Sequence, residues 1–344
     1  YLELRSELEG LGHTFQSTSD TESVLRAFCQ WGPDCVHRLN GMFAFALWDA
    51  SEKSLYLFRD RIGVKPLYYY RHDGVFAFAS ELKALHTSLR DRLEIDQDAL
   101  GEFLHYGYIS APRTIYRHVR KLEPGHWLKV SADHTLQDRC YWSIADFTPA
   151  AGATTIESSS IDRIEEIMVD AFTKRLIADV PVGVFLSGGV DSSLVTAILA
   201  RHTHTPIRTF TIGFKEKNYD GSFWAGKIAR RLGTEHMEEI VTPDHAREIL
   251  PLWPEIYDEP FGDISGIPTT IVSRMTRRHV KVSLSADGGD ELFCGYHRYW
   301  VMSRLDEYLS PLPAFIPRLG GRMIGIMGSD RFAELSQAHP KLRL

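Results

Sequence analysis

Cysteine is scarce in this sequence, and its spacing excludes two common kinds of protein. Only four cysteines, Cys29, Cys35, Cys140 and Cys294, occur among 344 residues, and no two of them form a Cys-x-x-Cys pair. Small disulfide-held folds and zinc-binding folds both depend on closely spaced cysteines. We therefore expect neither a disulfide framework nor a zinc site, and we expect a reducing, cytoplasmic location.

Long apolar runs and basic clusters are also missing. No apolar stretch approaches the length of about 18 residues that crosses a bilayer, and the first residues form no signal-peptide pattern. The formal net charge is −6, from 39 Lys and Arg against 45 Asp and Glu. Because such a chain is not attracted to nucleic acid or to an anionic membrane, we expect neither as a partner.

What is present is an ordinary globular composition, 44% hydrophobic and 24% charged, in a chain long enough for two domains. Helical patterns cover residues 2–11 and 21–31, the second opened by Ser19 or Asp20 as cap. Residues 42–80 contain four apolar and aromatic runs separated by turns, which predict an antiparallel sheet. A mixed helix-turn stretch over 93–108 and a strand pair over 115–130, turning at Pro124-Gly125, complete this part.

Residues 147–160 are rich in Ala, Thr, Ser and Gly and hold few large apolar groups, so we place a linker there. The linker separates a first domain, 1–146, from a second, 161–344. In the second domain helices alternate with strands over 182–186, 207–212, 237–241 and 280–284. Such alternation predicts an α/β fold with a parallel sheet, in which ligands bind beyond the carboxyl ends of the strands.

A glycine-rich loop follows the first of these strands. Residues 184–193 read VFLSGGVDSS, an apolar strand that breaks into Ser-Gly-Gly and then starts a helix at Ser192 or Ser193. Free backbone N–H groups at a helix start attract phosphate, and the glycines allow the ligand to approach. Asp191 would repel phosphate unless a divalent cation lay between them, so the pattern indicates Mg²⁺ with pyrophosphate or a nucleoside triphosphate. The alternative is a plain strand-turn-helix with a surface aspartate.

A second loop of this kind follows the last strand. Residues 282–295 read VSLSADGGDELFCG and carry three acids, Asp287, Asp290 and Glu291. Two such loops at the ends of parallel strands can face one nucleotide from opposite sides. Asp290 is therefore a second Mg²⁺ candidate, and Asp287 is a candidate for orienting the reacting centre. Taken alone, this loop is equally typical of an acidic surface turn that caps a helix.

Together the motifs resemble those of the glutamine-dependent asparagine synthetases. The second half carries, in the family's order, SGGVDSS (187–193), TFTIGF (209–214), DEPFGD (258–263), IPT (267–269) and LSADGGDELFCGY (284–296). The first half resembles the family's class II glutaminase domain in SDTE (19–22), LNGMFAFALWD (39–49), RDRIGVKPLYYY (59–70) and FASELKAL (78–85). The resemblance implies an α+β, Ntn-hydrolase-like glutaminase, followed by an α/β parallel-sheet ATP-pyrophosphatase of the adenine nucleotide α-hydrolase-like type.

The resemblance also implies a reaction. Similar proteins release ammonia from glutamine in the first domain and use ATP in the second to convert the side-chain carboxylate of aspartate to β-aspartyl-AMP. Ammonia then displaces AMP and gives asparagine, since AMP makes the carboxylate a better electrophile. The expected ligands are ATP, Mg²⁺, aspartate and glutamine, and a homodimer is one assembly in keeping with them.

Roles for single residues follow from the same resemblance. Pyrophosphate would be bound by Ser187, Gly188, Gly189, Asp191 and Ser192, with Mg²⁺ on Asp191 and Asp290. ATP would contact Leu186, Ile212, Ser285 and Ala286. Asp287 would be the acid that supports adenylate formation, and Asp20 would bind the α-amino group of glutamine, unless Asp20 only caps a helix.

Some positions depart from the family's pattern. The chain begins at Tyr1, after the segment that carries the family's N-terminal cysteine nucleophile, and ends at Leu344, before the family's later lysine. We therefore expect a piece of a longer protein that does not hydrolyse glutamine by itself. Ala286 replaces a more usual glycine, Asp287 is shorter than the glutamate of some members, and Gly221 replaces an acid.

The change at Gly221 leaves the acceptor open. The same chemistry on another carboxylate, such as a sugar uronate, a peptide carboxylate or the acceptor of a β-lactam synthetase, is one alternative. A nucleotide-binding module without catalysis is a second alternative, of a different class. The presence of both Asp191 and Asp290 argues against this second alternative.

Overall fold

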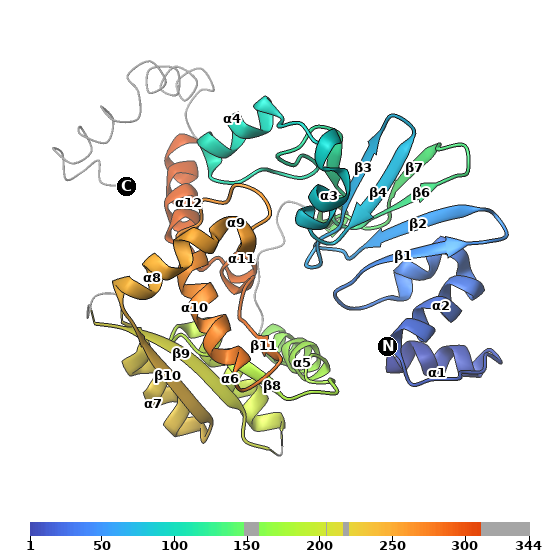
Figure 1. The fold of residues 1–344 in the computed structure, drawn as a ribbon. Coiled ribbons are helices and arrows are strands. Elements are labelled where there is room, and N and C mark those ends of the chain that lie inside the picture. Colours follow the sequence, from blue (N-terminus) through green and yellow to red (C-terminus); the bar gives the residue numbers. More distant parts are fainter. Residues whose placement is uncertain (148–157, 204, 216–219, 311–344) are drawn as a thin grey trace. The chain divides into compact units, whose positions relative to one another are not determined.

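A computed structural model describes residues 1–147, 158–203, 205–215 and 220–310 of the chain, which is drawn in Figure 1. These residues form two compact units. The first unit holds the described residues among 1–156 and 244–267, and the second holds those among 157–243 and 268–344. Most of the expected linker, 147–160, lies outside the described residues, so the domain boundaries stay predictions. No helix in the described ranges is long and apolar enough to cross a membrane.

The described strands of the first unit form two antiparallel sheets. One sheet has the order β1-β2-β6-β7, from β1 (Ala44–Asp49), β2 (Ser54–Arg59), β6 (His126–Val130) and β7 (Leu136–Cys140). The other has the order β4-β3-β5, from β3 (Tyr68–His72), β4 (Val75–Ala79) and β5 (Val119–Lys121). Its helices are α1 (Leu2–Gly10), α2 (Asp20–Trp31), α3 (Leu82–Leu89) and α4 (Gln97–Tyr106), with 3₁₀ turns at Gly32–Arg38, Arg90–Arg92 and Ile144–Phe147.

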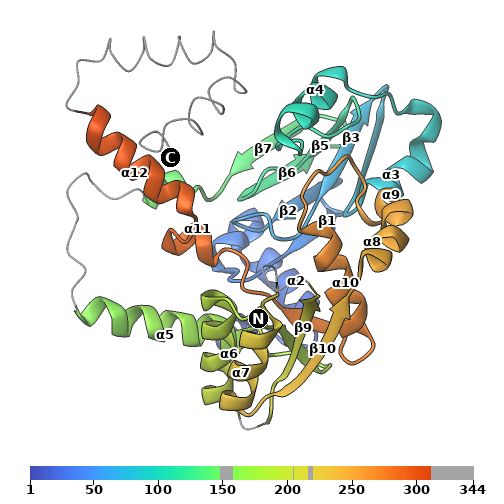
Figure 2. The same cartoon turned by 90° about the vertical axis from the view of Figure 1, so that its left-hand side faces the viewer.

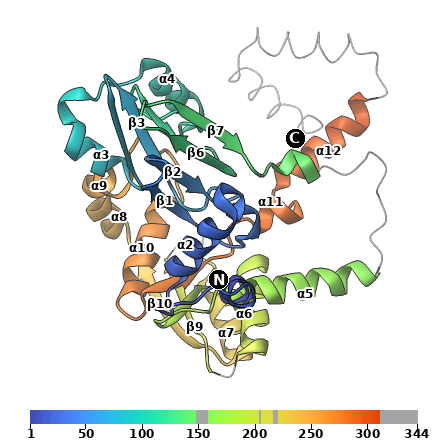
Figure 3. The ribbon, with the colours of Figure 1, turned by 90° about the vertical axis from the view of Figure 1, so that its right-hand side faces the viewer.

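The alternation of side chains on β2 explains the layers of this unit. Leu55 and Leu57 pack in one apolar cluster with Tyr69 of the second sheet, so the two sheets face each other. Phe58 points to the opposite face, where it packs with Phe28 of α2. On the outer side of the second sheet, α3 packs in a cluster that contains Tyr70 of β3. The result is a helix-sheet-sheet-helix arrangement, visible in Figure 3.

The sequence predicted these elements better than their pairing. The two N-terminal helices and the four strands of 42–80 are confirmed. The expectation that these four strands form one antiparallel sheet is wrong, because β1 and β2 belong to one sheet and β3 and β4 to the other. The strand pair expected over 115–130 is wrong, because β5 pairs with β3 while β6 pairs with β2. The turn at Pro124-Gly125 therefore leads the chain from one sheet into the other.

Residues 244–267 lie far along the chain but belong to the first unit. They include α9 (Trp253–Ile256) and most of α8 (Pro243–Ile249), with a 3₁₀ turn at Leu250–Leu252 between them. The Lys121 ammonium lies 2.5 Å from a carboxylate oxygen of Glu259, and both side chains are only 15% exposed. Lys83 pairs with Asp258 at 3.0 Å. These pairs attach the DEPFGD motif to the first unit, which the sequence did not predict.

The described strands of the second unit form a parallel sheet with the order β10-β9-β8-β11. The strands are β8 (Val182–Phe185), β9 (Arg208–Phe214), β10 (Glu235–Val241) and β11 (Val282–Leu284). The helices are α5 (Ser158–Lys174), α6 (Val190–His202), α7 (Ser222–Leu232), α10 (Gly266–Arg277), α11 (Gly289–Phe293) and α12 (His297–Leu309). The alternating α/β pattern predicted for this part is thereby confirmed.

Helices cover both faces of this sheet (Figure 2). On one face Leu199 of α6 packs with Val184 of β8 and with Phe172 of α5. On the other face Val272 of α10 packs with Phe210 of β9. Since β9 and β10 lie on one side of β8 and β11 on the other, the strand order reverses at β8. Ligands of open α/β sheets bind at this point, beyond the carboxyl ends of the strands.

Candidate active site

The loop after β8 has the backbone of a phosphate cradle. Gly188 has a positive φ of 82°, which favours glycine, and Gly189 is the N-cap of α6. The helix begins at Val190, two residues earlier than the first of the expected starts. Asp191 therefore lies in the first turn of α6, where the N–H groups and the helix dipole attract an anion.

Two serine side chains fix the shape of this loop. The hydroxyl of Ser192 accepts a hydrogen bond from the Ser187 N–H at 3.2 Å and lies 3.0 Å from the Ser187 hydroxyl. Ser192 is buried, and its hydroxyl also lies 3.3 Å from the carbonyl of Gly189, to which it donates. The loop is thus held before any ligand arrives, with Ser187 exposed.

The loop after β8 packs tightly against the start of α7. A Cβ placed on Gly221 would lie 2.4 Å from the carbonyl oxygen of Ser187, and one placed on Gly188 would lie 2.7 Å from the carbonyl oxygen of Gly221. Neither position can take a side chain without a shift of the backbone. A glycine at position 221 fits this close approach.

The loop after β11 reaches the first loop. Gly289 lies against Asp191, since a Cβ on Gly289 would be 2.7 Å from the carboxyl carbon of Asp191. In the same loop the Ser285 hydroxyl donates to a carboxylate oxygen of Asp287 at 2.6 Å. The expectation that the two loops lie together at the ends of neighbouring strands is met by this contact.

The remaining acids of the second loop are engaged locally. The carboxylate of Asp290 lies against Gly295, where a Cβ would leave it no room. Glu291 accepts a hydrogen bond from the Tyr296 hydroxyl at 2.8 Å, and this bond lowers the pKa of the Glu291 carboxyl. Asp290 and Glu291 both belong to α11, whose N-cap, Gly288, has a positive φ of 94°.

A cavity of about 340 Å³ opens beside the first loop. Its lining is mainly apolar, and it includes Leu186, Ile212 and Phe214 from the ends of β8 and β9 and Pro268 and Thr269 from α10. The buried Thr211 hydroxyl donates to the carbonyl of Leu186 and fixes this strand end. The volume lies at the lower end of the range for small-molecule sites.

The predicted residues of the second domain fall into three groups. Leu186, Ser187 and Ile212 line the cavity. Ser187, Gly188, Gly189, Asp191 and Ser192 form the loop at the start of α6. Ser285 and Ala286 are not among the described residues that line the cavity, and Ala286 packs instead with the apolar cluster of Val184. Their individual roles stay predictions.

In the first unit, Asp20 lines a cavity of about 440 Å³ together with Tyr1, Arg38 and Asn40. The cap of α2 is Ser19, whose side chain accepts from the Thr21 N–H at 3.1 Å. Asp20 is the first residue of the helix and is exposed. Asp20 is therefore not the cap of α2, and it lies at the cavity, where its role stays a prediction.

Sequence reasoning gave no role to Glu22, which builds the turn before this helix. Its carboxylate accepts from the backbone N–H groups of Gln16 and Ser17 and from the Ser17 hydroxyl. These bonds lower the pKa of Glu22 to about 2, with the Gln16 N–H as the largest cause. The spacing of Ser19 and Glu22 is that of a capping box, which could have revealed the residue.

Asp60, in the motif RDRIGVKPLYYY, was also missed. It is buried, and its carboxylate accepts from the backbone N–H groups of Val64 and Lys65, each at 2.9 Å. The neighbouring Arg59 donates to the carbonyls of Gly63 and Leu122. Asp60 and Arg59 therefore hold the turn that follows β2. An aspartate at the end of an apolar strand offered no signal of these partners.

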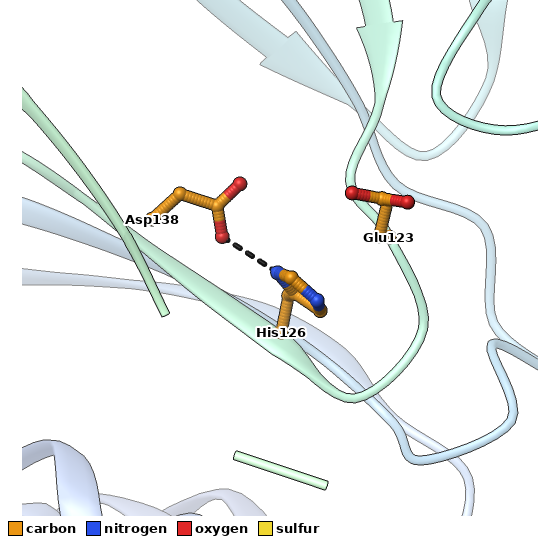
Figure 4. A group of neighbouring side chains, drawn as sticks. All are labelled: Glu123, His126 and Asp138. Carbon is orange, nitrogen blue, oxygen red and sulfur yellow. Dashed lines mark hydrogen bonds and ion pairs between the residues drawn. The ribbon is translucent and has the colours of Figure 1, made fainter. Parts of the chain in front are cut away.

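A further group of ligand-type side chains lies at the start of β6 and on β7. Figure 4 shows Glu123, His126 and Asp138, whose ligand atoms all lie within 4.8 Å of one another. His126 Nδ1 lies 2.7 Å from a carboxylate oxygen of Asp138. This hydrogen bond accounts for the approach of two of the three.

The described elements define a class of protein: an amidotransferase-type unit of two antiparallel sheets, followed by a parallel-sheet unit with the phosphate loop of an ATP-pyrophosphatase. Family comparison matches residues 163–342 to a model described as asparagine synthase and residues 1–142 to a glutamine amidotransferase domain. The chain belongs to the asparagine synthase family. The fold class expected from the sequence is confirmed.

Curated proteins that are similar to this chain include several named asparagine synthetase. The chain is 36% identical over 299 residues to asparagine synthetase (glutamine-hydrolyzing) 1 of Bacillus subtilis. The aligned region covers 87% of this chain and 46% of that protein. It is 36% identical over 327 residues to a putative asparagine synthetase (glutamine-hydrolyzing) 2 of Methanocaldococcus jannaschii, covering 94% and 62%. A more distant relative, amidase chyE of Penicillium rubens, is 27% identical over 304 residues, covering 83% and 44%. The chain thus spans about half the length of such relatives.

Proposed function

We propose that the full-length protein is a glutamine-hydrolysing asparagine synthase, a ligase that forms a carbon–nitrogen bond at the expense of ATP. It converts aspartate, glutamine and ATP to asparagine, glutamate, AMP and diphosphate. The carboxylate oxygen of aspartate attacks the α-phosphorus of ATP and releases diphosphate. Ammonia from glutamine then attacks the carbonyl carbon of β-aspartyl-AMP and releases AMP.

One observation carries this proposal: the loops after β8 and β11 meet where the strand order reverses, with Gly289 against Asp191. A nucleotide bound at this point has the N–H groups of α6 on one side. On the other side lies the Ser285–Asp287 pair. A nucleotide-binding module without catalysis would need only the first of these loops.

The first loop is suited to the diphosphate part of ATP. Gly188 and Gly189 expose the backbone, and Ser187 adds an exposed hydroxyl. The carboxylate of Asp191 and the serine hydroxyls offer the hard oxygen ligands that Mg²⁺ prefers, so these residues fit the ion. When bound, Mg²⁺ would neutralise charge on the phosphates. We assign Asp290, on α11 beside this loop, as the second carboxylate for it.

The cavity beside the loop is suited to the adenine part of ATP. Leu186 and Ile212 line it, and a flat aromatic base gains stability by burial against such side chains. Ser285 and Ala286, in the loop after β11, would face the nucleotide from the other strand end. Asp287, held by Ser285, would orient the aspartate that is being activated.

The first unit would supply ammonia. Asp20 lies exposed in a cavity large enough for glutamine, and its carboxylate can pair with the α-ammonium group of that substrate. The ligands are then small molecules, namely glutamine, aspartate and ATP. A cytoplasmic location and a homodimer complete the proposal.

ATP/pyrophosphate exchange on the full-length protein tests it, with aspartate offered against a panel of other carboxylic acids. We expect exchange that requires aspartate and that falls by about a hundredfold or more in Asp191→Asn. Gly226→Ala, on the same sheet face but outside the loop, serves as the folded control. Exchange with no acid, or exchange that Asp191→Asn leaves intact, would refute the assignment.

A second candidate keeps the chemistry and changes the acceptor. Gly221 stands where the family has an acid, and its contact with Ser187 forbids a side chain there. The relative named amidase chyE bears a name that does not mention asparagine. Exchange that is specific for a uronate, a peptide carboxylate or a β-lactam-synthetase-type acceptor would favour this candidate over asparagine synthesis.

A further inference from the structure

The first unit contains a second cavity, of about 490 Å³, at the end of the sheet β4-β3-β5. The strands of this sheet are drawn in Figures 1 and 2. The volume of the cavity lies within the range of small-molecule sites. Its lining residues are Tyr69, Arg71, Asp96, Arg113, Thr114, Tyr116, His118, Val119, Arg120 and Leu136. None of them lines the cavity that holds Asp20. The proposed reaction therefore gives it no role.

Strand pairing brings the polar residues to one face of the sheet. Tyr69 of β3 lies directly opposite Arg120 of β5, and opposite residues of an antiparallel pair share a face. Arg71 lies two residues beyond Tyr69 and so on the same face, and its N–H donates to the carbonyl of His118 at 3.0 Å. Two arginines and a histidine are thus gathered by the register itself.

The charge in this cavity is one-sided. Three arginines line it, and the only acidic residue among the lining residues is Asp96. The carboxylate of Asp96 is already used as the cap of α4, where it accepts from the N–H groups of Asp98 and Ala99 at 2.9 and 3.2 Å. Among the lining residues little negative charge is left to balance the guanidinium groups. From outside the lining, the charges of Asp138 and Glu123 act on Tyr69 together with those of Arg120 and Arg71.

The arginines themselves are weakly engaged. Arg71 donates to the carbonyl of His134 at 3.3 Å, and Arg113 lies 3.8 Å from Glu102, at the limit of an ion pair. The side chain of Arg120 has no hydrogen bond or ion pair with any residue that the structure describes. The His118 ring stacks on His72, with centroids 3.8 Å apart, and this holds it at the rim. Most guanidinium donors are therefore open to a ligand.

We propose that this cavity binds a small molecule that carries phosphate. Guanidinium groups bind phosphate oxygens in pairs, and three of them around one cavity favour a ligand with at least two negative charges. The hydroxyl of Tyr69 and the ring of Tyr116 provide further polar and aromatic contacts for the rest of such a molecule. The site is independent of the proposed asparagine synthesis, because none of its residues lines the cavity of Asp20 or the cavity beside the loop after β8.

Pyrophosphate is a suitable probe, with the whole chain studied at low ionic strength. Amide hydrogen exchange locates the binding: we expect slower exchange in residues 113–122 on addition of pyrophosphate. Any effect in residues 184–193 reports the loop after β8 separately. Calorimetry gives the affinity, and Arg120→Gln should weaken binding at this site roughly tenfold or more, since it removes charge-assisted hydrogen bonds.

Matched variants keep the test decisive. Arg90→Gln removes an exposed arginine outside the cavity and should leave the affinity unchanged, whereas Arg113→Gln should weaken it like Arg120→Gln. Arg120→Lys keeps the charge but lacks the planar guanidinium group, so its affinity for pyrophosphate should lie between those of the wild type and Arg120→Gln. The proposal is overturned if residues 113–122 exchange equally with and without pyrophosphate, or if Arg120→Gln and Arg113→Gln, both folded by thermal unfolding, bind as the wild type does.

Discussion

Asp20 and Glu22, two acids of the motif SDTE, have different environments although they lie two residues apart. Asp20 is exposed at a cavity, and Glu22 accepts hydrogen bonds from the turn that precedes α2. A carboxylate that receives several N–H bonds is favoured in its charged form. At the scale of single residues, the motif therefore combines a candidate ligand contact with a structural anchor.

Glu22 should make stability depend on acidity in a defined range. The pKa of Glu22 is lowered from 4.5 to about 2 on folding. Its contribution to the free energy of unfolding is therefore complete above about pH 4.5 and is lost as the pH falls toward 2. We expect Glu22→Gln to be less stable than the wild type at pH 7, with a difference that shrinks below pH 4.5. Urea denaturation at several pH values measures this. Ser17→Ala, which leaves the two backbone donors, should show a smaller effect. A difference independent of pH would contradict the prediction.

The thiols should differ in reactivity. Cys35 is fully buried, and burial raises its pKa to about 12, whereas Cys29, Cys140 and Cys294 are exposed. Since the thiolate is the reactive form, iodoacetamide at pH 7.5 should label the three exposed cysteines of the native chain and spare Cys35. Mass spectrometry of peptides measures the labelling. In denaturant all four should react, and equal labelling of Cys35 in the native chain would contradict the prediction.

At the scale of elements, the start of α7 and the loop after β8 depend on each other. Position 221 has no room for a side chain, because a Cβ placed on Gly221 would lie 2.4 Å from the Ser187 carbonyl oxygen. Gly221→Ala should displace the loop and lower ATP/pyrophosphate exchange by at least about tenfold, with the fold retained. Gly226→Ala is the matched control on the same helix, since its Cβ would meet its nearest neighbour at 3.6 Å. That control should be stabilising by about 0.5–1 kcal/mol. An unaltered rate of ATP/pyrophosphate exchange in Gly221→Ala would contradict the prediction, since the loop after β8 would then tolerate the displacement.

The elements that could be predicted are those with a local signal. A run of apolar and aromatic residues gave β2, and the Ser-Gly-Gly break gave the loop before α6. The partners of β5 and β6 could not be predicted, because a strand of three to five residues fits either sheet until its long-range contacts choose. Most residues of the candidate site came from the two glycine-rich loop motifs, whereas the contact of Gly289 with Asp191 needed the fold.

At the scale of the whole molecule, chain order and spatial grouping differ. Residues 244–267 follow β10 of the second unit in the sequence but belong to the first unit. There the N–H of Gly262 donates a hydrogen bond to the carbonyl of Gly107. Burial raises the pKa of Tyr68 to about 12, and the charge of Glu259 adds to the shift. Nothing local in the sequence predicted this return, because DEPFGD contains no periodicity and its partners lie in an earlier part of the chain.

The pair of Lys121 and Glu259 should therefore matter more for stability than a surface pair. Glu259 also accepts from the N–H of Ile115 at 3.2 Å, so Glu259→Leu leaves a partly buried ammonium and an N–H without this partner. We expect a loss of about 2 kcal/mol in the free energy of unfolding. Adding Lys121→Met should recover part of it, because the lone charge is then removed.

Arg163→Gln, which breaks the exposed pair with Glu166, provides the comparison and should cost at most about 0.5 kcal/mol. Urea denaturation gives the three values, and amide hydrogen exchange of residues 244–267 tells where the structure loosens. Faster exchange in that segment in Glu259→Leu, with the rest of the first unit less affected, is the expected pattern. If Glu259→Leu costs no more than Arg163→Gln, then apolar packing rather than the ion pair holds this segment on the first unit.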